Sequence, residues 1–141
     1  MSPHSPAMAP ALHFAPELLL KAQGQGLGMR GAIFDVDGVL TDGRLYIGEH
    51  GETVKAFHTL DGHGLKLLVR AGITPVIVTG RDSPAVRRRV ADLGLQHASY
   101  GAEDKLAAAQ AQLDRLGFEW TDVAVIGDDW PDLPLLHRAG F

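Results

Sequence analysis

Three aspartates fall within eight positions of the stretch FDVDGVLTDG, residues 34–43, directly after an apolar run. Asp35 and Asp37 are two residues apart, so an extended backbone would send both side chains to the same side. Clustered carboxylates repel, and they raise one another's pKa unless something neutralises them. Mg²⁺ does so, and it binds one or two carboxylates together with a substrate phosphate. The stretch predicts a metal site, with ordinary turn aspartates as the alternative.

Polar residues also follow the other apolar runs that read as strands. Thr79, Gly80 and Arg81 follow one run, Asp128 and Asp129 follow another, and Lys105 begins a helical pattern. Ligands of open α/β sheets bind at the carboxyl ends of the strands, where these residues would converge. Taken singly, each has an ordinary role in a turn, a cap or a solvated face. Taken together, they predict a phosphate site.

Each member of this set has a chemical role in phosphoryl transfer. A carboxylate beside Mg²⁺ can attack phosphorus and form an aspartyl-phosphate. A second acid two residues away can protonate the leaving alkoxide and then deprotonate the attacking water. Thr79 can donate a hydrogen bond to a phosphoryl oxygen, and Lys105 can bind phosphate as a point charge. Arg81 can grip a phosphate or a substrate carboxylate with its fork, or it can be a solvated arginine.

The elements that must position these residues alternate between strand and helix. This alternation, with continuous apolar strands, favours an α/β fold built on a doubly wound parallel sheet. The turn GEHGE predicts a small β-hairpin insertion at about residues 44–57. Ser83 and Pro84 predict the start of one helix, with Ser83 as its N-cap. The expected strands are residues 31–36, 73–80, 95–101 and 122–129, and the expected helices are 64–72, 83–94, 103–117 and 131–140.

The amino-acid composition argues against several other classes of function. The 141 residues suffice for one domain, 45% of them are apolar and 21% are charged. A net charge of −4 speaks against nucleic acid, and the absence of cysteine excludes disulfides and thiolate zinc sites. No apolar run is long enough to span a membrane, so we expect no membrane partner and a cytoplasmic location. Residues 1–30 are expected to be a partly disordered N-terminal extension with a short helix from Pro16 and a glycine linker.

The motifs DVDGVLTDG, VTGR, Lys105 and GDDWPD, in this order, resemble the four motifs of the haloacid dehalogenase superfamily of phosphatases. The resemblance covers residues 31–141 and implies a Rossmann-like core. It implies Asp35 as nucleophile, Asp37 as general acid and base, and Thr79 and Lys105 as phosphate-site residues. By the same resemblance, Mg²⁺ is bound by Asp35, the backbone carbonyl of Asp37, and Asp128, with Asp129 and Asp132 as supporting carboxylates.

Residues 37–73 resemble the capless branch that includes 3-deoxy-D-manno-octulosonate 8-phosphate (KDO-8-phosphate) phosphatase. This branch implies no cap domain, a sugar-phosphate substrate of lipopolysaccharide precursor synthesis, and a homotetramer whose hairpins share a sheet. Nonulosonate (sialic-acid-type) 9-phosphates are the alternative substrates. Asp61, in TLDGHG, is expected near the substrate, with helix capping as its other role. The apolar hairpin residues Leu45, Tyr46, Ile47, Val54 and Phe57 would be buried between copies, unless the hairpin folds back on its own domain.

Two other function classes also fit part of the pattern. A phospho-accepting receiver domain combines the same residue types, but it places its acceptor aspartate on a middle strand, and VTGR and SYGAE provide none. A catalytically idle scaffold would keep the motifs and act through assembly.

The family continues with a further strand and helix, whereas this sequence stops at Phe141, so we expect that segment to be missing.

Overall fold

A four-stranded parallel sheet forms the centre of the fold. The structure, a computed structural model, describes residues 28–141, so the helix and glycine linker predicted within residues 1–27 lie outside the described part. The strand order is β5 (Ala98–Ser99), β4 (Thr74–Val78), β1 (Gly31–Phe34) and β6 (Val123–Ile126). All neighbouring strands are parallel. The predicted α/β class is confirmed.

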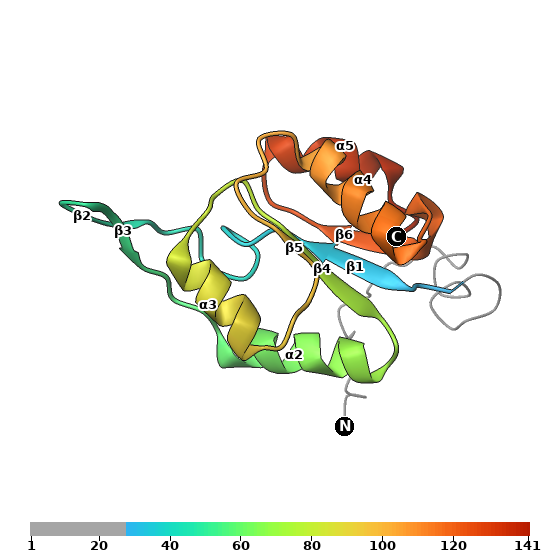
Figure 1. The fold of residues 1–141 in the computed structure, drawn as a ribbon, viewed down its shortest axis with the longest axis horizontal. Helices are drawn as coiled ribbons and strands as arrows, with labels where there is room; N and C mark the ends of the chain where they lie inside the picture. Colours follow the sequence, from blue (N-terminus) through green and yellow to red (C-terminus); the bar gives the residue numbers. More distant parts are fainter. Residues whose placement is uncertain (1–27) are drawn as a thin grey trace, which may run out of the picture.

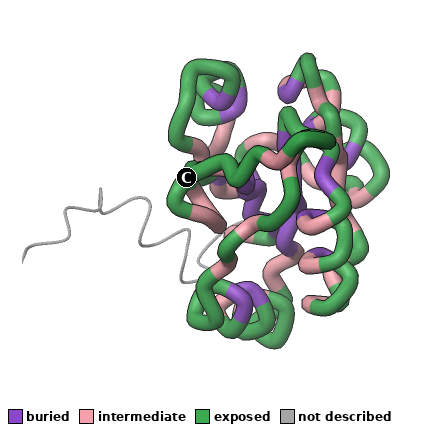
Figure 2. Tube along the Cα trace, turned by 90° about the vertical axis from the view of Figure 1, so that its left-hand side faces the viewer, coloured by how far each residue is buried: buried purple, intermediate pink, exposed green. Residues whose placement is uncertain are grey.

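Helices cover both faces of this sheet. Helices α2 (Thr59–Arg70) and α3 (Pro84–Asp92) pack on one face, and α4 (Lys105–Leu116) and α5 (Leu133–Arg138) on the other (Figure 1). Successive strand residues therefore point into two different core clusters: Ile33 and Val76 face α4, whereas Ala32 and Ile77 face α2 and α3. Burial on both faces explains why the strands are continuous apolar runs. Figure 2 shows buried residues in the centre of the fold and also on the helices around it.

The hairpin is a separate two-stranded antiparallel sheet. It consists of β2 (Tyr46–Gly48) and β3 (Gly51–Val54), which confirms the predicted turn, and it projects from the body of the fold (Figure 1). Its apolar residues Leu45, Tyr46, Ile47 and Val54 are exposed in the single chain. Phe57 differs from them, because it packs against the core beside α2 and α3.

Of two helix starts, that of α2 differs from the sequence prediction and that of α3 agrees with it. Helix α2 begins at Thr59, earlier than predicted, because the Nδ1 atom of His58 accepts a hydrogen bond from the Leu60 N–H. The helix tolerates Gly62 because the neighbouring helix lies close: a Cβ there would lie 2.4 Å from an Arg89 guanidinium nitrogen. Ser83 is the N-cap residue of α3, as predicted, but its hydroxyl donates to Glu52 instead of capping the helix.

Two short 3-10 helices, η1 (Trp120–Asp122) and η2 (Trp130–Asp132), flank β6 on the α4 side of the sheet. Asp129 caps η2 by accepting from the Trp130 N–H at 2.7 Å. None of the helices within residues 28–141 combines the length and apolar character that crossing a membrane requires.

Candidate active site

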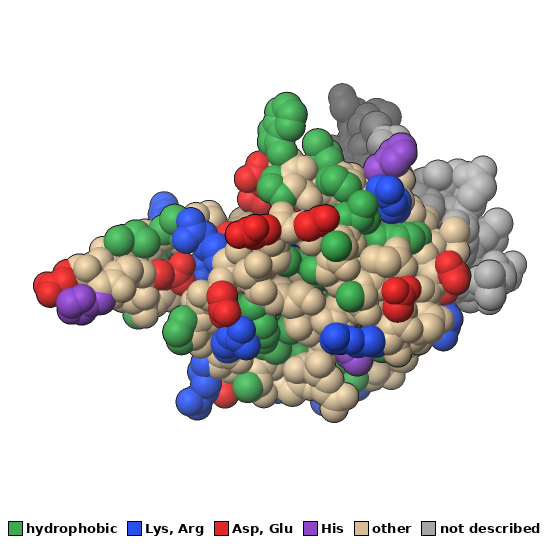
Figure 3. Space-filling model, turned by 45° about the horizontal axis from the view of Figure 1, so that its top comes forward, with side chains coloured by type: hydrophobic (Ala, Val, Ile, Leu, Met, Phe, Trp, Pro, Cys, Tyr) green, Lys and Arg blue, Asp and Glu red, His purple; other side chains and the backbone are tan. Residues whose placement is uncertain are grey.

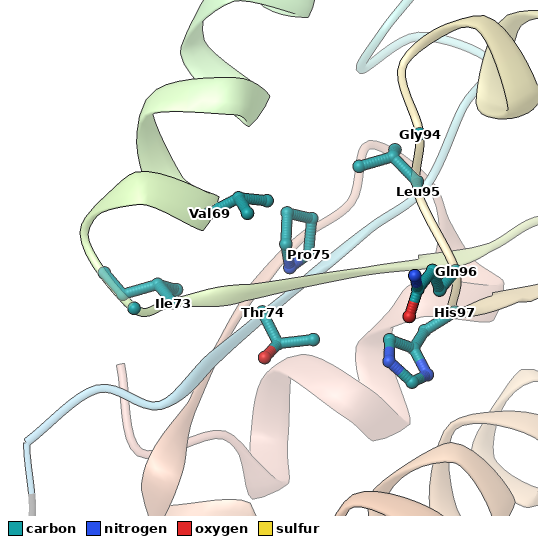
Figure 4. A pocket seen from close by; sticks show the side chains of 9 residues that line it. Val69, Ile73, Thr74, Pro75, Gly94, Leu95, Gln96 and His97 are labelled. Carbon is teal, nitrogen blue, oxygen red and sulfur yellow. The ribbon is translucent and has the colours of Figure 1, made fainter.

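Two surface cavities of similar size lie at opposite ends of the sheet. One, of about 300 Å³, lies at the amino-terminal edge of β4 and is lined by uncharged side chains such as Val69, Pro75 and Gln96 (Figure 4). The other, of about 320 Å³, lies at the carboxyl edge, where the predicted site residues converge. Its lining residues are Asp35, Asp37, Gly43, Leu45, Gly80, Arg81, Lys105, Asp128, Asp129 and Pro131. The charged cavity at the carboxyl edge is therefore the candidate active site.

Asp35 lies at the bottom of this cavity. It follows the end of β1 directly, its amide donates to the Ile126 carbonyl at 3.0 Å, and only 6% of the residue is exposed. Burial raises the pKa of its carboxyl, while hydrogen bonds from the Val36 amide and the Lys105 ammonium oppose the rise. Burial disfavours the ionised form of this carboxyl group, and a nearby cation favours it.

Lys105 is the buried cation of the site. As the first residue of α4 it is held by the cap at Asp104, and its Nζ lies 3.0 Å from Asp35 and 2.6 Å from Asp132. Burial disfavours its charge, but the hydrogen bonds and charges of these two aspartates outweigh burial and raise the pKa of Lys105. The ammonium therefore links β1, α4 and η2 at the cavity floor.

Asp132 is saturated by this arrangement. One of its oxygens accepts from Lys105, and the other accepts from the amides of Asp128 and Asp129, each at 3.2 Å. Oxygens of Asp35, Asp128 and Asp132 all lie within 4.8 Å of one another, a grouping that can hold a metal ion. Because Asp132 already accepts three hydrogen bonds, Asp35 and Asp128 are the carboxylates with capacity for a cation.

Gly38 makes room for Asp128. Its φ is +85°, and a Cβ at this position would lie 1.8 Å from the Oδ2 atom of Asp128. Only glycine allows both the backbone conformation and this approach. The cavity thus has a cradle for Asp128, and its hard oxygen donors are of the type that Mg²⁺ takes.

Asp37 lies at the cavity rim between two cations. Its Oδ1 is 2.5 Å from the Lys55 Nζ, and its Oδ2 is 3.9 Å from the Arg81 Nε. Burial works against the Lys55 charge, but the hydrogen bonds and charges of Asp37 and Glu52 outweigh it and raise the pKa of Lys55. Neither Lys55 nor Glu52 was predicted from the sequence as part of the site, because a lysine and a glutamate on a two-stranded hairpin are usually solvated.

The remaining predicted residues divide into two groups. Gly80 and Arg81 line the cavity, and Thr79 is fully buried beneath it, where its Oγ1 accepts from the Arg81 amide at 3.4 Å. Asp61 does not reach the cavity within this chain: it lies in the first turn of α2 beside Leu40 and Phe57. It is not the cap of α2 either, since His58 fills that position.

Comparison with known proteins agrees with this geometry. The haloacid dehalogenase-like hydrolase family matches residues 50–140. The chain is 44% identical over 108 residues to the KDO-8-phosphate phosphatase KdsC of Haemophilus influenzae, covering 77% of this chain and 60% of that protein. Against KdsC of Salmonella typhimurium, it is 38% identical over 126 residues, covering 89% of this chain and 65% of that protein.

A solved structure extends the likeness to the fold. KDO-8-phosphate phosphatase from Moraxella catarrhalis, in complex with magnesium ion, phosphate ion and KDO, is 42% identical with a TM-score of 0.80. The match covers 89% of this chain and 70% of that one. By family match, sequence identity and fold, this chain belongs to the haloacid dehalogenase-like hydrolases.

Proposed function

We propose that this protein is an Mg²⁺-dependent phosphatase that hydrolyses KDO-8-phosphate, a reaction of lipopolysaccharide precursor synthesis. The observation that carries the proposal is the convergence of Asp35, Asp37 and Lys105 on one cavity at the carboxyl edge of the sheet. The relatives named for KDO-8-phosphate support the choice of substrate. The chain spans about 60% of the length of those curated relatives, so its activity and its substrate are proposals.

The residues suggest a two-step reaction. A carboxylate oxygen of Asp35 attacks phosphorus and forms an O–P bond, while the bond from phosphorus to the sugar oxygen breaks and its electron pair stays on that oxygen. Asp37, as a carboxylic acid, gives its proton to the departing oxygen, and KDO leaves as an alcohol. The ionised Asp37 then takes a proton from water, whose oxygen attacks the phosphoryl group and releases inorganic phosphate and Asp35.

The other residues of the site stabilise the negative charge of the carboxylates and of the phosphoryl group during these steps. Lys105 lies 3.0 Å from Asp35 and neutralises negative charge at the cavity floor. Thr79 and Gly80 would present hydrogen bonds to phosphoryl oxygens, and Arg81 would bind the phosphate or the sugar carboxylate. Asp35, Asp128 and the backbone carbonyl of Asp37 would hold Mg²⁺, with Asp129 and Asp132 in support. When bound, Mg²⁺ offsets the repulsion between the carboxylates and the phosphoryl oxygens.

The function is tested by phosphate release from KDO-8-phosphate, a nonulosonate 9-phosphate and a hexose phosphate, each with Mg²⁺ and with a chelator. We expect Mg²⁺-dependent release that is greatest for KDO-8-phosphate and absent in Asp35→Asn. Asp92→Asn, an exposed carboxylate on α3 that pairs with Arg88, is the matched control and keeps full activity. Release from the nonulosonate alone would replace the substrate, and no release from any ester would overturn the function.

Assembly into a homotetramer is part of the proposal. The hairpin carries four exposed apolar residues and projects from the body, at the left of Figure 3. An isolated two-stranded hairpin is marginal by itself, so contact with other copies would stabilise it. Ile47, 63% exposed, would lie at such a contact. Light scattering should give a tetramer mass that Ile47→Glu lowers and His50→Ala, at the turn, leaves unchanged. A wild-type monomer would contradict the assembly.

Substrate contact by Asp61 and a cytoplasmic location stay predictions.

A further inference from the structure

We propose that Lys55 is a positioning residue for the general acid: it holds one carboxylate oxygen of Asp37 so that the other oxygen faces the substrate. The inference rests on the proposed function, in which Asp37 protonates the leaving oxygen. It adds a role for the hairpin inside its own subunit, separate from any contact with other copies.

The contact between Lys55 and Asp37 is short and shielded from solvent. The Lys55 Nζ lies 2.5 Å from the Asp37 Oδ1, and only 1% of the lysine side chain is exposed. A charged hydrogen bond that excludes water is stronger than a solvated surface pair. Lys55 does not line the cavity, so its contact with the site passes through Asp37.

Lys55 is in turn held in place by Glu52. Glu52, on β3, lies 3.1 Å from the Lys55 Nζ with one oxygen, and its other oxygen accepts from the Ser83 hydroxyl at 2.9 Å. Ser83 is 5% exposed at the start of α3, and its hydroxyl serves this contact instead of capping the helix. A continuous chain of polar contacts therefore runs from α3 through Glu52 and Lys55 to Asp37.

The two oxygens of Asp37 consequently have different surroundings. Oδ1 is bound to Lys55, whereas Oδ2 lies on the Arg81 side at 3.9 Å, and Arg81 lines the cavity. A carboxyl group that is free to rotate would not keep its proton in line with the leaving oxygen. Displacing a catalytic group by about 1 Å can cost on the order of 100-fold in rate.

Substrates with different leaving groups can distinguish a positioning role of Lys55 from a merely structural one. An alkyl phosphate such as KDO-8-phosphate needs a proton on its departing oxygen, whereas p-nitrophenolate departs without one. The ratio kcat/KM reports the steps up to cleavage of the ester, before the intermediate is hydrolysed. A misplaced proton donor therefore lowers kcat/KM for the alkyl ester far more than for p-nitrophenyl phosphate.

The experiment compares kcat/KM for both esters in wild type, Lys55→Met, Lys55→Arg and Asp37→Asn. We expect Lys55→Met to lose about 100-fold with the alkyl ester and less than about 10-fold with the aryl ester. KM should change little, Lys55→Arg should restore part of the loss, and Asp37→Asn should show the same preference more strongly. Lys66→Met, an exposed lysine on α2, is the matched control with wild-type values.

A second variant covers the case in which Lys55→Met does not fold. Glu52→Gln keeps the lysine but loosens its anchor, so it should show the same ester preference in weaker form. Equal losses for both esters in these variants, or no loss, overturn the positioning role while the phosphatase function stands. A wild-type protein that cleaves neither ester overturns the proposed function and the inference together.

Discussion

Replacing Gly38 by alanine tests whether the cradle for Asp128 is needed for activity. The backbone at Gly38 has φ +85°, where an L-residue costs about 1–2 kcal/mol relative to glycine. The added Cβ would lie 1.8 Å from the Oδ2 atom and 2.5 Å from the Cγ atom of Asp128. Carbon atoms in contact need about 3.5 Å, so the carboxylate must retreat by more than about 1 Å.

The two consequences of this substitution have different magnitudes. The Asp128 side chain is exposed and can swing outward, so the free energy of unfolding should fall only by the strain of about 1–2 kcal/mol. Its displacement from Asp35, however, should lower kcat/KM by at least about 100-fold. The Mg²⁺ concentration needed for half of the remaining activity should rise as well.

Gly72→Ala provides the matched control. Gly72 has φ +79° and no atom within 4 Å of an added Cβ, and it lies at the far edge of the sheet. This variant should lose the same stability in urea unfolding and keep wild-type phosphate release. If Gly38→Ala keeps activity within about threefold of Gly72→Ala at saturating Mg²⁺, the close approach of Asp128 to Gly38 is not needed for catalysis.

Three further predictions concern charge. Lys105→Met should lower the free energy of unfolding by about 3 kcal/mol, because it leaves Asp35 and Asp132 buried without their cation; unchanged urea unfolding would contradict this. Asp35→Asn should abolish turnover yet stabilise the protein without Mg²⁺ at neutral pH, because the raised pKa of Asp35 makes its ionised form unfavourable to folding. This gain should vanish below about pH 3.8, where the carboxyl is protonated in both states, and a gain that persists there would contradict it. Burial works against the Glu52 carboxylate, but Lys55 and Ser83 outweigh it and lower the pKa of Glu52. Its stabilisation is therefore present above about pH 4.5 and lost as pH falls through the lowered pKa, so Glu52→Gln and wild type should converge in acid, and a constant difference would refute the pairing.

The central sheet and the main carboxylates were predictable because short-range patterns determine them. Continuous apolar runs indicate strands covered on both faces, and the rule for parallel sheets brings Asp35 and Asp128 to one edge. Lys105 was predictable for the same reason, since the start of α4 faces that edge. The roles of these residues in catalysis remain predictions that the variants above address.

The contacts of the hairpin were not predictable from local patterns. Lys55 and Asp37 are 18 residues apart, and their pairing depends on how the hairpin leaves the body of the fold. The Ser83–Pro84 pattern correctly marks the start of α3, but capping rules cannot reveal that the hydroxyl turns to Glu52. The start of α2 was missed because glycines usually argue against a helix, whereas Gly62 is buried where Arg89 lies close.

The most direct test of the proposed mechanism is to find the phosphoryl group on the protein. Turnover of KDO-8-phosphate with Mg²⁺ is stopped in acid within its first cycle, and the peptides are analysed by mass spectrometry. The mechanism predicts one phosphoryl group on the peptide that contains Asp35, and none in Asp35→Asn. A phosphoryl group on another residue, or rapid phosphate release without any labelled peptide, would contradict the assignment of Asp35 as nucleophile.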